Sequence, residues 1–224
     1  MKSVLVTGGT VRLGKAIAER LRADGWRVIT SSHRADAGAD IVADLTEPMG
    51  AAKLYAAALQ MLDGNPPDAL VNNAALFTGD AGAIAAVNLE APKKLTMMMA
   101  GREVGVGAVV NVLDSKAVVA ISDKRRDAAS PLLSPYLDSK CELLAFTRAS
   151  AATFAATLRV NGVAPGPVMA PTGVHAKAGE TLLDRRPTPA DVADAVAYLL
   201  NAASVTGAVL PVDSGQHLLE AGTW

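Results

Sequence analysis

The chain has 224 residues and a formal net charge of −1, and half of its residues are hydrophobic although only 4% are aromatic. The length is typical of one domain, residues 1–224, with a large core. The near-neutral charge and the lack of an apolar run of about 18 residues argue against nucleic acid and membranes as partners.

Short apolar runs rich in β-branched residues alternate with helical patterns along the chain. The runs are nearly continuous, as in strands that are covered on both faces. Strands are expected at Ser3–Thr7, Arg27–Ser31, Asp40–Ala43, Ala69–Val71, Gly107–Leu113, Leu158–Val163 and Ala208–Val212. Helices are expected from near Arg12 to a stop at Gly25, and at Pro48–Leu62, Ala81–Val104, Pro135–Thr153 and Pro189–Ala202.

This alternation predicts an α/β fold, a single Rossmann-like, doubly wound parallel sheet of about seven strands flanked by helices on both faces. Residues 166–187 have weak pattern and are rich in Pro and Gly, which predicts a flexible substrate flap. The charged stretch 122–130 either covers the entrance of a site or mediates contacts between subunits.

The cysteine and histidine residues bear on whether the chain has disulfides or a metal site. The single cysteine, Cys141, rules out an internal disulfide, and Met1 leads directly into the first expected strand without a secretory signal pattern. We therefore expect a cytoplasmic protein. The histidines His33, His175 and His217 lack the spacing of metal ligands, so no metal site is expected.

The first expected strand runs into a glycine-rich turn, T-G-G-T-V-R-L-G, from Thr7 to Gly14. Gly8, Gly9 and Gly14 allow the backbone to turn tightly and approach a ligand, while the following helix offers unpaired N–H groups and the positive end of its dipole. The turn favours a bound nucleotide, but it is not the G-x-G-x-x-G fingerprint. A purely structural turn is therefore the alternative.

The end of the second expected strand bears on the type of nucleotide. Where a chain that prefers NAD places an acid for the ribose 2′-hydroxyl, this one has Ser31-Ser32-His33-Arg34 and no carboxylate. Arg12, in the glycine turn, can face the same ribose. Guanidinium and hydroxyl donors suit a 2′-phosphate, so the sequence favours NADPH/NADP⁺, with two solvated surface arginines as the alternative.

Tyr136 and Lys140 stand four residues apart in Y-L-D-S-K, a spacing that puts both on one face of a helix. Ser134 and Pro135 fit the N-cap and N1 positions, so Tyr136 is expected in the first helical turn. An ammonium and a helix N-terminus near a phenol both favour the phenolate, which predicts a lowered pKa for Tyr136. Together with the glycine turn, this pair indicates hydride transfer coupled to proton transfer.

These motifs, with four others in the same order, resemble the short-chain dehydrogenase/reductases over essentially the whole length. The others are Asn72-Asn73-Ala74, Asn88, Pro165-Gly166-Pro167 and Asp191-Val192-Ala193. The resemblance implies that Asp44 and Leu45 hold the adenine, that Asn88 carries a proton-relay water, and that Lys140 binds the nicotinamide ribose. The cofactor-binding residues expected are Gly8, Arg12, Leu13, Gly14, Ser32, His33, Arg34, Asp44, Leu45, Asn73, Ala74, Tyr136, Lys140, Pro165 and Gly166.

Two departures from the family pattern indicate a branch within it. The middle glycine of the turn is Arg12 here, and the usual catalytic serine is Asp114, in Asn111-Val112-Leu113-Asp114. Both resemble the pteridine reductase and dihydromonapterin reductase branch, in which an aromatic residue stacks on the pterin at the place of Phe77. The resemblance thus implies catalytic residues Asp114, Tyr136, Lys140 and Asn88 and substrate contacts from Phe77, Asp114 and Tyr136. It also implies a homotetramer or homodimer packed through the Tyr136 helix, and the tail ending in Trp224 is a candidate for burial against another subunit.

The identity of residue 114 decides which substrate is expected. An ionised aspartate accepts hydrogen bonds from an aminopyrimidine edge and a protonated one can donate to a ring nitrogen, so Asp114 suits a C=N substrate better than a ketone. Alternatively, Asp114 only caps the following turn and Ser115 takes the serine role. The expected function is therefore reduction of a pterin-like C=N bond with NADPH and Tyr136 as proton donor. The alternatives are a ketone or aldehyde reductase using Ser115, and a non-catalytic nucleotide-sensing protein of the same fold.

Overall fold

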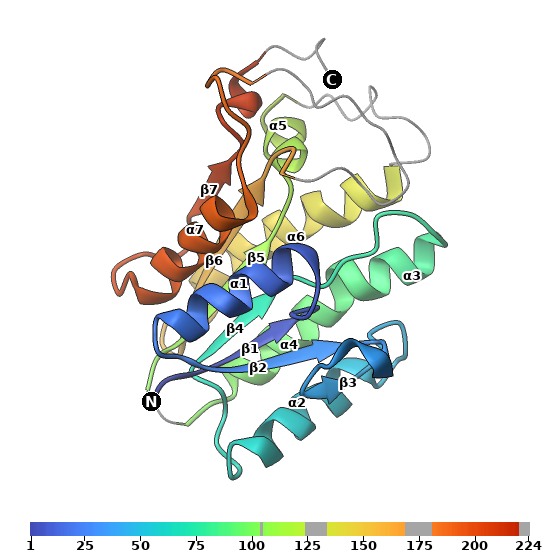
Figure 1. Cartoon of the computed structure of the whole chain (residues 1–224), viewed down its shortest axis with the longest axis vertical. Coiled ribbons are helices and arrows are strands. Elements are labelled where there is room, and N and C mark those ends of the chain that lie inside the picture. Colours follow the sequence, from blue (N-terminus) through green and yellow to red (C-terminus); the bar gives the residue numbers. More distant parts are fainter. Residues whose placement is uncertain (104, 124–133, 169–180, 220–224) are drawn as a thin grey trace.

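The computed structural model describes residues 1–103, 105–123, 134–168 and 181–219. Its seven strands form one sheet in the order β3-β2-β1-β4-β5-β6-β7, and every neighbouring pair is parallel (Figure 1). The strands are β1 (Ser3–Thr7), β2 (Arg27–Ser32), β3 (Ile41–Val42), β4 (Ala69–Asn72), β5 (Gly107–Val112), β6 (Leu158–Pro165) and β7 (Val209–Val212). The predicted sheet is confirmed, and the expected bounds of each strand are right to within two residues.

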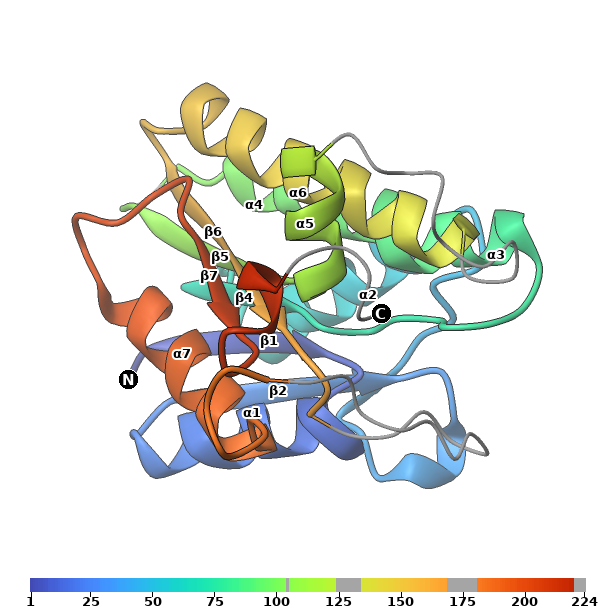
Figure 2. The ribbon, with the colours of Figure 1, turned by 90° about the horizontal axis from the view of Figure 1, so that it is seen from above.

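Helices cover both faces of this sheet. Figure 2 shows α1 (Arg12–Ala23) and α7 (Pro189–Asn201) on one face, and α2 (Gly50–Met61), α4 (Ala91–Ala100) and α6 (Ser134–Thr153) on the other. Because strand side chains alternate between faces, Val4 and Val6 of β1 pack toward α1 and α7, while Leu5 between them packs toward α2 and α4. All five residues of β1 and all six of β5 are buried, which explains their nearly continuous apolar sequence.

The expected helix Ala81–Val104 is divided into three parts. They are α3 (Ala81–Ala85), the π-helical turn η2 (Ala86–Glu90) and α4, and the backbone N–H of Ala91 donates to the carbonyl of Ala86, five residues earlier. Pro92 has no N–H to donate to the carbonyl of Asn88, which disfavours the regular α-helical ladder there. Asn88 therefore lies inside a π turn, a local geometry that often occurs at functional sites.

Within the described ranges, three short elements were not expected from the sequence. They are α5 (Ser115–Asp123) and the 3₁₀ turns η1 (Ala35–Ala37) and η4 (Gln216–Leu218). The pair Val118-Val119 within α5 has poor intrinsic helix propensity, but Asp114 stabilises the start of the helix, because its Oδ1 accepts the backbone N–H of Lys116 at 2.9 Å.

Several predictions concern residues that the structure does not describe. Residues 169–180 of the expected flap, 124–130 of the charged stretch, and Trp224 lie outside the described ranges, as does the side chain of Ser134. In the described part of the chain, no helix has the length and apolar character needed to cross a membrane.

The strand order fixes where a site can form. The chain leaves β1 toward β2 on one side, whereas β4 joins β1 on the other side, so the order reverses at the carboxyl ends of β1 and β4. Ligands of open parallel sheets bind in the crevice at such a switch point. The glycine turn after β1 and the Asn73-Ala74 segment after β4 both start there.

Candidate active site

The turns that follow β1 and β4 are tied together by hydrogen bonds. Thr7 Oγ1 accepts the backbone N–H groups of Asn73 at 2.9 Å and Ala74 at 3.0 Å. In return, Asn73 Nδ2 donates to the carbonyls of Thr7 at 2.9 Å and Gly8 at 3.2 Å. Gly8 has a φ of 63°, in the left-handed region that favours glycine. The structure thus brings Gly8, Asn73 and Ala74 together as predicted.

Gly14, in the first turn of α1, permits the closest backbone approach in this region. A Cβ atom at Gly14 would lie 2.0 Å from the carbonyl oxygen of Gly8 and 2.5 Å from Asn73 Nδ2. No side chain fits in that space, so the helix N-terminus can lie directly against the glycine turn only with glycine at this position.

We expect Gly14→Ala to destabilise the protein by about 1–3 kcal/mol, because the backbone of the glycine turn must shift to admit a methyl group. Urea unfolding measures this change. The matched control is Gly101→Ala, where the nearest atom to the added Cβ is the Met98 carbonyl at 3.6 Å. Equal stability of the two variants would contradict the close approach at Gly14.

Arg12 stands where the resembled family usually has a glycine, and its backbone adopts a conformation that favours glycine. Its φ of 50° lies in the left-handed region, which costs a non-glycine residue about 1–2 kcal/mol. Arg12 is exposed, at the start of α1. Contact of its side chain with a ribose phosphate stays a prediction, as does the placement of Leu13.

At the carboxyl end of β2 the structure adds a carboxylate that the sequence interpretation missed. Arg34 binds Asp36 through two hydrogen bonds, from Nε to Oδ1 at 2.9 Å and from Nη2 to Oδ2 at 2.6 Å. Hydrogen bonds from Arg34 and its positive charge lower the pKa of the Asp36 carboxyl. Ser32 Oγ accepts the N–H of Arg34 at 3.1 Å, and His33 is exposed beside them. The predicted cluster of Ser32, His33 and Arg34 exists, but an acid lies next to it.

The expected adenine residues follow β3. Asp44 Oδ1 accepts the hydroxyl of Thr46 at 2.6 Å and its backbone N–H at 2.8 Å, and both bonds lower the pKa of Asp44. Leu45 is buried against the core formed with α2. One carboxylate oxygen of Asp44 thus already accepts two hydrogen bonds within its own turn.

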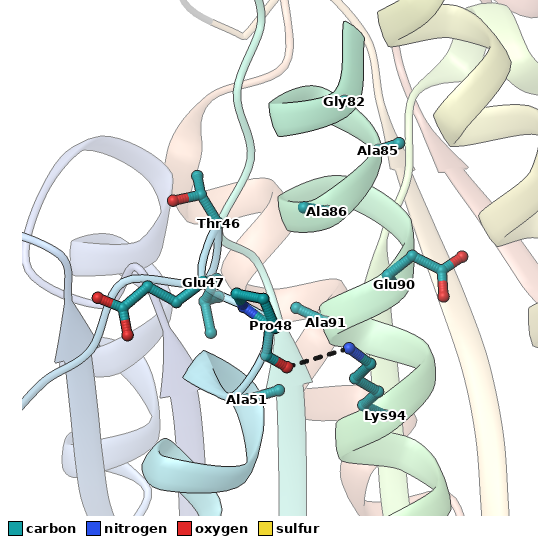
Figure 3. A pocket seen from close by; sticks show the side chains of 11 residues that line it. Thr46, Glu47, Pro48, Ala51, Gly82, Ala85, Ala86, Glu90, Ala91 and Lys94 are labelled. Carbon is teal, nitrogen blue, oxygen red and sulfur yellow. Dashed lines mark hydrogen bonds between the residues drawn. The ribbon is translucent and has the colours of Figure 1, made fainter. Parts of the chain in front are cut away.

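A hollow of about 270 Å³ lies between the segment that starts at Leu45 and the α3–η2–α4 helices, and Figure 3 shows the side chains that line it. At its edge, Lys94 Nζ donates to the carbonyl of Pro48 at 3.3 Å. The side chains around it are mostly small or apolar and include Leu45, Ala51, Ala85, Ala86 and Ala91. Phe77, Asp114 and Tyr136 are not among its lining residues, so the hollow is separate from the groups suited to proton transfer.

Asp114, Tyr136 and Phe77 meet at the carboxyl end of β5. The Tyr136 hydroxyl donates to Asp114 Oδ2 at 2.9 Å, while the other oxygen of Asp114 caps α5. The rings of Phe77 and Tyr136 have centroids 4.8 Å apart at an interplanar angle of 58°, a favourable tilted contact. One carboxylate therefore both caps α5, as the alternative interpretation expects, and contacts Tyr136, while the catalytic and substrate roles of Asp114 stay predictions. Ser115 is buried as the first residue of α5.

Lys140 lies one turn along α6 from Tyr136, as the spacing predicts. Its Nζ donates to the carbonyl of Val112 at 2.8 Å and lies 5.8 Å from the centroid of the Tyr136 ring. Burial lowers the pKa of Lys140 to about 8, although the charge of Asp114 partly offsets this.

The pKa of Tyr136 is raised well above its ordinary value, so the predicted lowering is wrong for this structure. Burial is the largest cause, followed by the negative charge of Asp114 and the hydrogen bond to it. Lys140 directs its ammonium to the Val112 carbonyl, and so does not offset these effects. The Tyr136 hydroxyl therefore keeps its proton at neutral pH.

Asn88 connects the Phe77 segment to α6. Its side-chain amide makes both backbone hydrogen bonds of Leu76, accepting from N at 2.8 Å and donating to O at 2.9 Å. Nδ2 also donates to Ser139 Oγ at 3.1 Å, and Ser139 Oγ donates to the carbonyl of Tyr136 at 2.6 Å. Asn88 thus positions the residues on both sides of the aromatic contact, while its predicted role with a relay water stays untested.

The sequence interpretation missed Ser139 and the carbonyl of Val112. Ser139 is the third residue after Tyr136, so the i, i+3 spacing on the same helix was the signal that could have identified it. A backbone carbonyl leaves no signal in the sequence. Among the described residues, no group of three or more His, Cys, Asp or Glu could hold a metal ion.

The turn after β6 packs on the turn after β7. The N–H of Gly166 donates to the carbonyl of Val212 at 3.0 Å, and a Cβ at Gly166 would lie 2.5 Å from the Cβ of Asp213. Asp213 is buried and accepts the backbone N–H of His217 at 2.7 Å. Pro165 and Gly166 are thus held at the same edge of the sheet as the other predicted residues.

Comparisons with known proteins find relatives over almost the whole chain. A family model described as enoyl-(acyl carrier protein) reductase matches residues 11–217. A granaticin polyketide synthase putative ketoacyl reductase 2 of Streptomyces violaceoruber is 32% identical over 96% of this chain and 96% of its own length. Pteridine reductase 1 of Leishmania tarentolae is 28% identical over 97% of this chain and 96% of its own. The crystal structure of FolM alternative dihydrofolate reductase 1 from Brucella canis, complexed with NADP, has a TM-score of 0.82 and 30% identity over 99% of this chain and 96% of that one.

Proposed function

The chain belongs to the short-chain dehydrogenase/reductase family, and on that premise we propose that it is an NADPH-dependent reductase of a pterin-like C=N substrate. The observation that carries the proposal is the 2.9 Å hydrogen bond between Tyr136 and Asp114, at the place where the family usually has a serine. The Phe77 ring against Tyr136 adds a flat apolar surface on which a heteroaromatic ring can stack.

The residues around the glycine turn fit a dinucleotide. Gly14 lets the N-terminus of α1 lie directly against the glycine turn, and the N–H groups of a helix N-terminus suit phosphate oxygens. Ser32, His33 and Arg34 would hold a 2′-phosphate, and Asp44 and Leu45 would border the adenine. Asn73, Ala74, Pro165 and Gly166 would line the path to the nicotinamide ribose, which Lys140 would bind. When bound, the cofactor would supply the hydride.

The chain's own side chains would supply the proton and orient the substrate. Tyr136 stays protonated at neutral pH and so can give its proton to the substrate nitrogen as general acid. Asp114 accepts hydrogen bonds, and the aminopyrimidine edge of a pterin carries N–H donors that suit it. Asn88 fixes the backbone of Leu76, and with it the neighbouring Phe77.

A turnover assay tests the proposed function. The protein should oxidise NADPH with a dihydropterin and leave simple ketones unreacted. The ketoacyl reductase relative favours the opposite pattern, in which Ser115 takes the serine role and ketones react. Binding of NADPH without turnover on either panel would indicate a nucleotide-sensing protein. We also propose a homotetramer or homodimer, which sedimentation measures.

We expect Arg34→Ala to weaken NADPH binding by about tenfold or more and to change NADH binding by less than about twofold, since NADH lacks the phosphate that a guanidinium binds. Titration of the protein with each cofactor, followed by cofactor fluorescence, measures both. The control is Arg148→Ala, which removes an exposed arginine of α6. An unchanged ratio of the two affinities would contradict the 2′-phosphate assignment.

A further inference from the structure

Arg34, the residue assigned to the 2′-phosphate, already binds an anion of its own chain. Its Nε and Nη2 atoms donate to the two oxygens of Asp36 at 2.9 and 2.6 Å, a fork that uses one whole edge of the guanidinium. Asp36 stands in η1, which begins three residues after the end of β2, and Gly38 ends that turn with a φ of 64°. Both side chains are exposed, at 60% and 69%.

A carboxylate and a phosphate bind a guanidinium through the same kind of paired hydrogen bonds. A 2′-phosphate at Arg34 must either displace Asp36 or take the second edge of the guanidinium with the carboxylate nearby. In the first case the hydrogen bonds between Arg34 and Asp36 are lost. In the second case the negative charges of the phosphate and the Asp36 carboxylate come close. Both effects weaken NADPH binding, and neither acts on NADH, whose ribose carries a neutral hydroxyl.

Two other acids near the end of β2 have hydrogen-bond partners of their own. Asp40 Oδ2 accepts the hydroxyl of Thr30 at 2.7 Å and its backbone N–H at 2.8 Å. Asp44 Oδ1 accepts two hydrogen bonds from Thr46, at 2.6 and 2.8 Å, within its own turn. The backbone N–H of Arg34 donates a hydrogen bond to Ser32 Oγ. This hydrogen bond holds the residue before η1 close to the end of β2. Asp36 is therefore the carboxylate whose position bears on Arg34.

We infer that Asp36 is a specificity-determining residue that competes with the 2′-phosphate for Arg34 and so reduces the preference of the protein for NADPH over NADH. The inference rests on the proposed function, because it takes NADPH as the cofactor. It assigns to Asp36 a positioning role that acts through Arg34. Because the 2′-phosphate must compete with the Asp36 carboxylate, the affinities for NADPH and NADH differ less than they would if Arg34 had no carboxylate beside it.

Asp36→Asn removes the charge and keeps the shape of the side chain. We expect the dissociation constant of NADPH to fall about three- to fivefold, the range that exposed ion pairs contribute, and that of NADH to change by less than about 1.5-fold. Titrations with NADPH and NADH at fixed ionic strength measure both. Glu19→Gln is the matched control, since it removes an exposed carboxylate 3.8 Å from Lys15 on α1 and changes the net charge equally.

A second pair of variants tests whether Asp36 acts through Arg34. In the Arg34→Ala background, Asp36→Asn should raise NADPH affinity by less than about 1.5-fold, because the shared guanidinium is gone. Unchanged or weaker NADPH binding in Asp36→Asn, or an equal gain in Glu19→Gln, would overturn the inference while leaving the proposed function intact. A wild-type protein that binds neither cofactor would overturn the proposed function and the inference with it.

Discussion

Tyr136→Phe is expected to lower the rate of substrate reduction by about 10²–10⁴-fold, the usual contribution of a positioned general acid. The substitution removes only the hydroxyl oxygen, which is the atom bonded to Asp114 at 2.9 Å. The ring remains and keeps its contact with Phe77 at 4.8 Å between centroids. The loss should therefore appear in kcat, while the dissociation constant of NADPH changes by less than about twofold.

The control for this variant is Tyr198→Phe, which removes the hydroxyl of a tyrosine on α7 that is 59% exposed. It should keep wild-type turnover and stability. Single-turnover oxidation of NADPH separates the chemical step from product release, and a fluorescence titration measures cofactor binding. Turnover of Tyr136→Phe within about threefold of wild type would remove Tyr136 from the proton transfer.

The sheet could be predicted from the sequence because strands buried on both faces leave a strong signal. β5 is an example, since its six residues are all buried and their sequence, Gly107 to Val112, is nearly apolar throughout. The division of the expected helix at Ala86–Glu90 was harder to predict, because Pro92 is compatible with a helix start, a kink or a π turn. α5 was missed because its valines favour a strand, while its stabilising cap depends on one hydrogen bond from Lys116 to Asp114.

The sequence could predict that Tyr136 and Lys140 lie close together, but not their protonation behaviour. Spacing placed Tyr136 and Lys140 on one helix, and the structure confirms that helix. The direction of the Tyr136 pKa shift could not be predicted, because it depends on burial and on which acceptor Lys140 finds. The acceptor is the carbonyl of Val112, at the end of β5 and 28 residues earlier in the chain. The contact between Arg34 and Asp36 similarly depends on η1, a turn that the pattern does not predict.

The raised pKa keeps Tyr136 protonated at neutral pH, but it also makes the phenol a weaker acid than one whose pKa lies near the working pH. A proton donor must hold its proton until the substrate nitrogen develops negative charge, and a phenol with a raised pKa does so at neutral pH. The hydrogen bond to Asp114 then has to be exchanged for one to the substrate. A substrate that offers N–H donors to Asp114 makes this exchange favourable, because the carboxylate keeps its hydrogen-bond partners.

The second large effect on turnover is expected from a substitution of Asp114. Asp114→Ser should reduce turnover of a dihydropterin by about 10²-fold, because the aminopyrimidine edge loses a charged acceptor. Serine is also a good N-cap, so α5 should remain stable, and ketones, which need a hydroxyl donor, should react as well as or better than with the wild type. The control is Asp80→Asn, which changes another N-cap carboxylate, bonded to Ala83 N at 3.0 Å at the start of α3.

Asp114→Asn tests the charge of the residue separately, through the pH dependence of reduction. Asp114 raises the pKa values of both Tyr136 and Lys140, so its neutralisation should lower both, that of Lys140 from about 8. Reduction requires the protonated forms, so activity is lost as pH rises through these pKa values. The basic limb of the kcat/KM profile should therefore move to lower pH in Asp114→Asn. A basic limb at the wild-type position would mean that the carboxylate does not act electrostatically on the proton donor, and would contradict its proposed role with a C=N substrate.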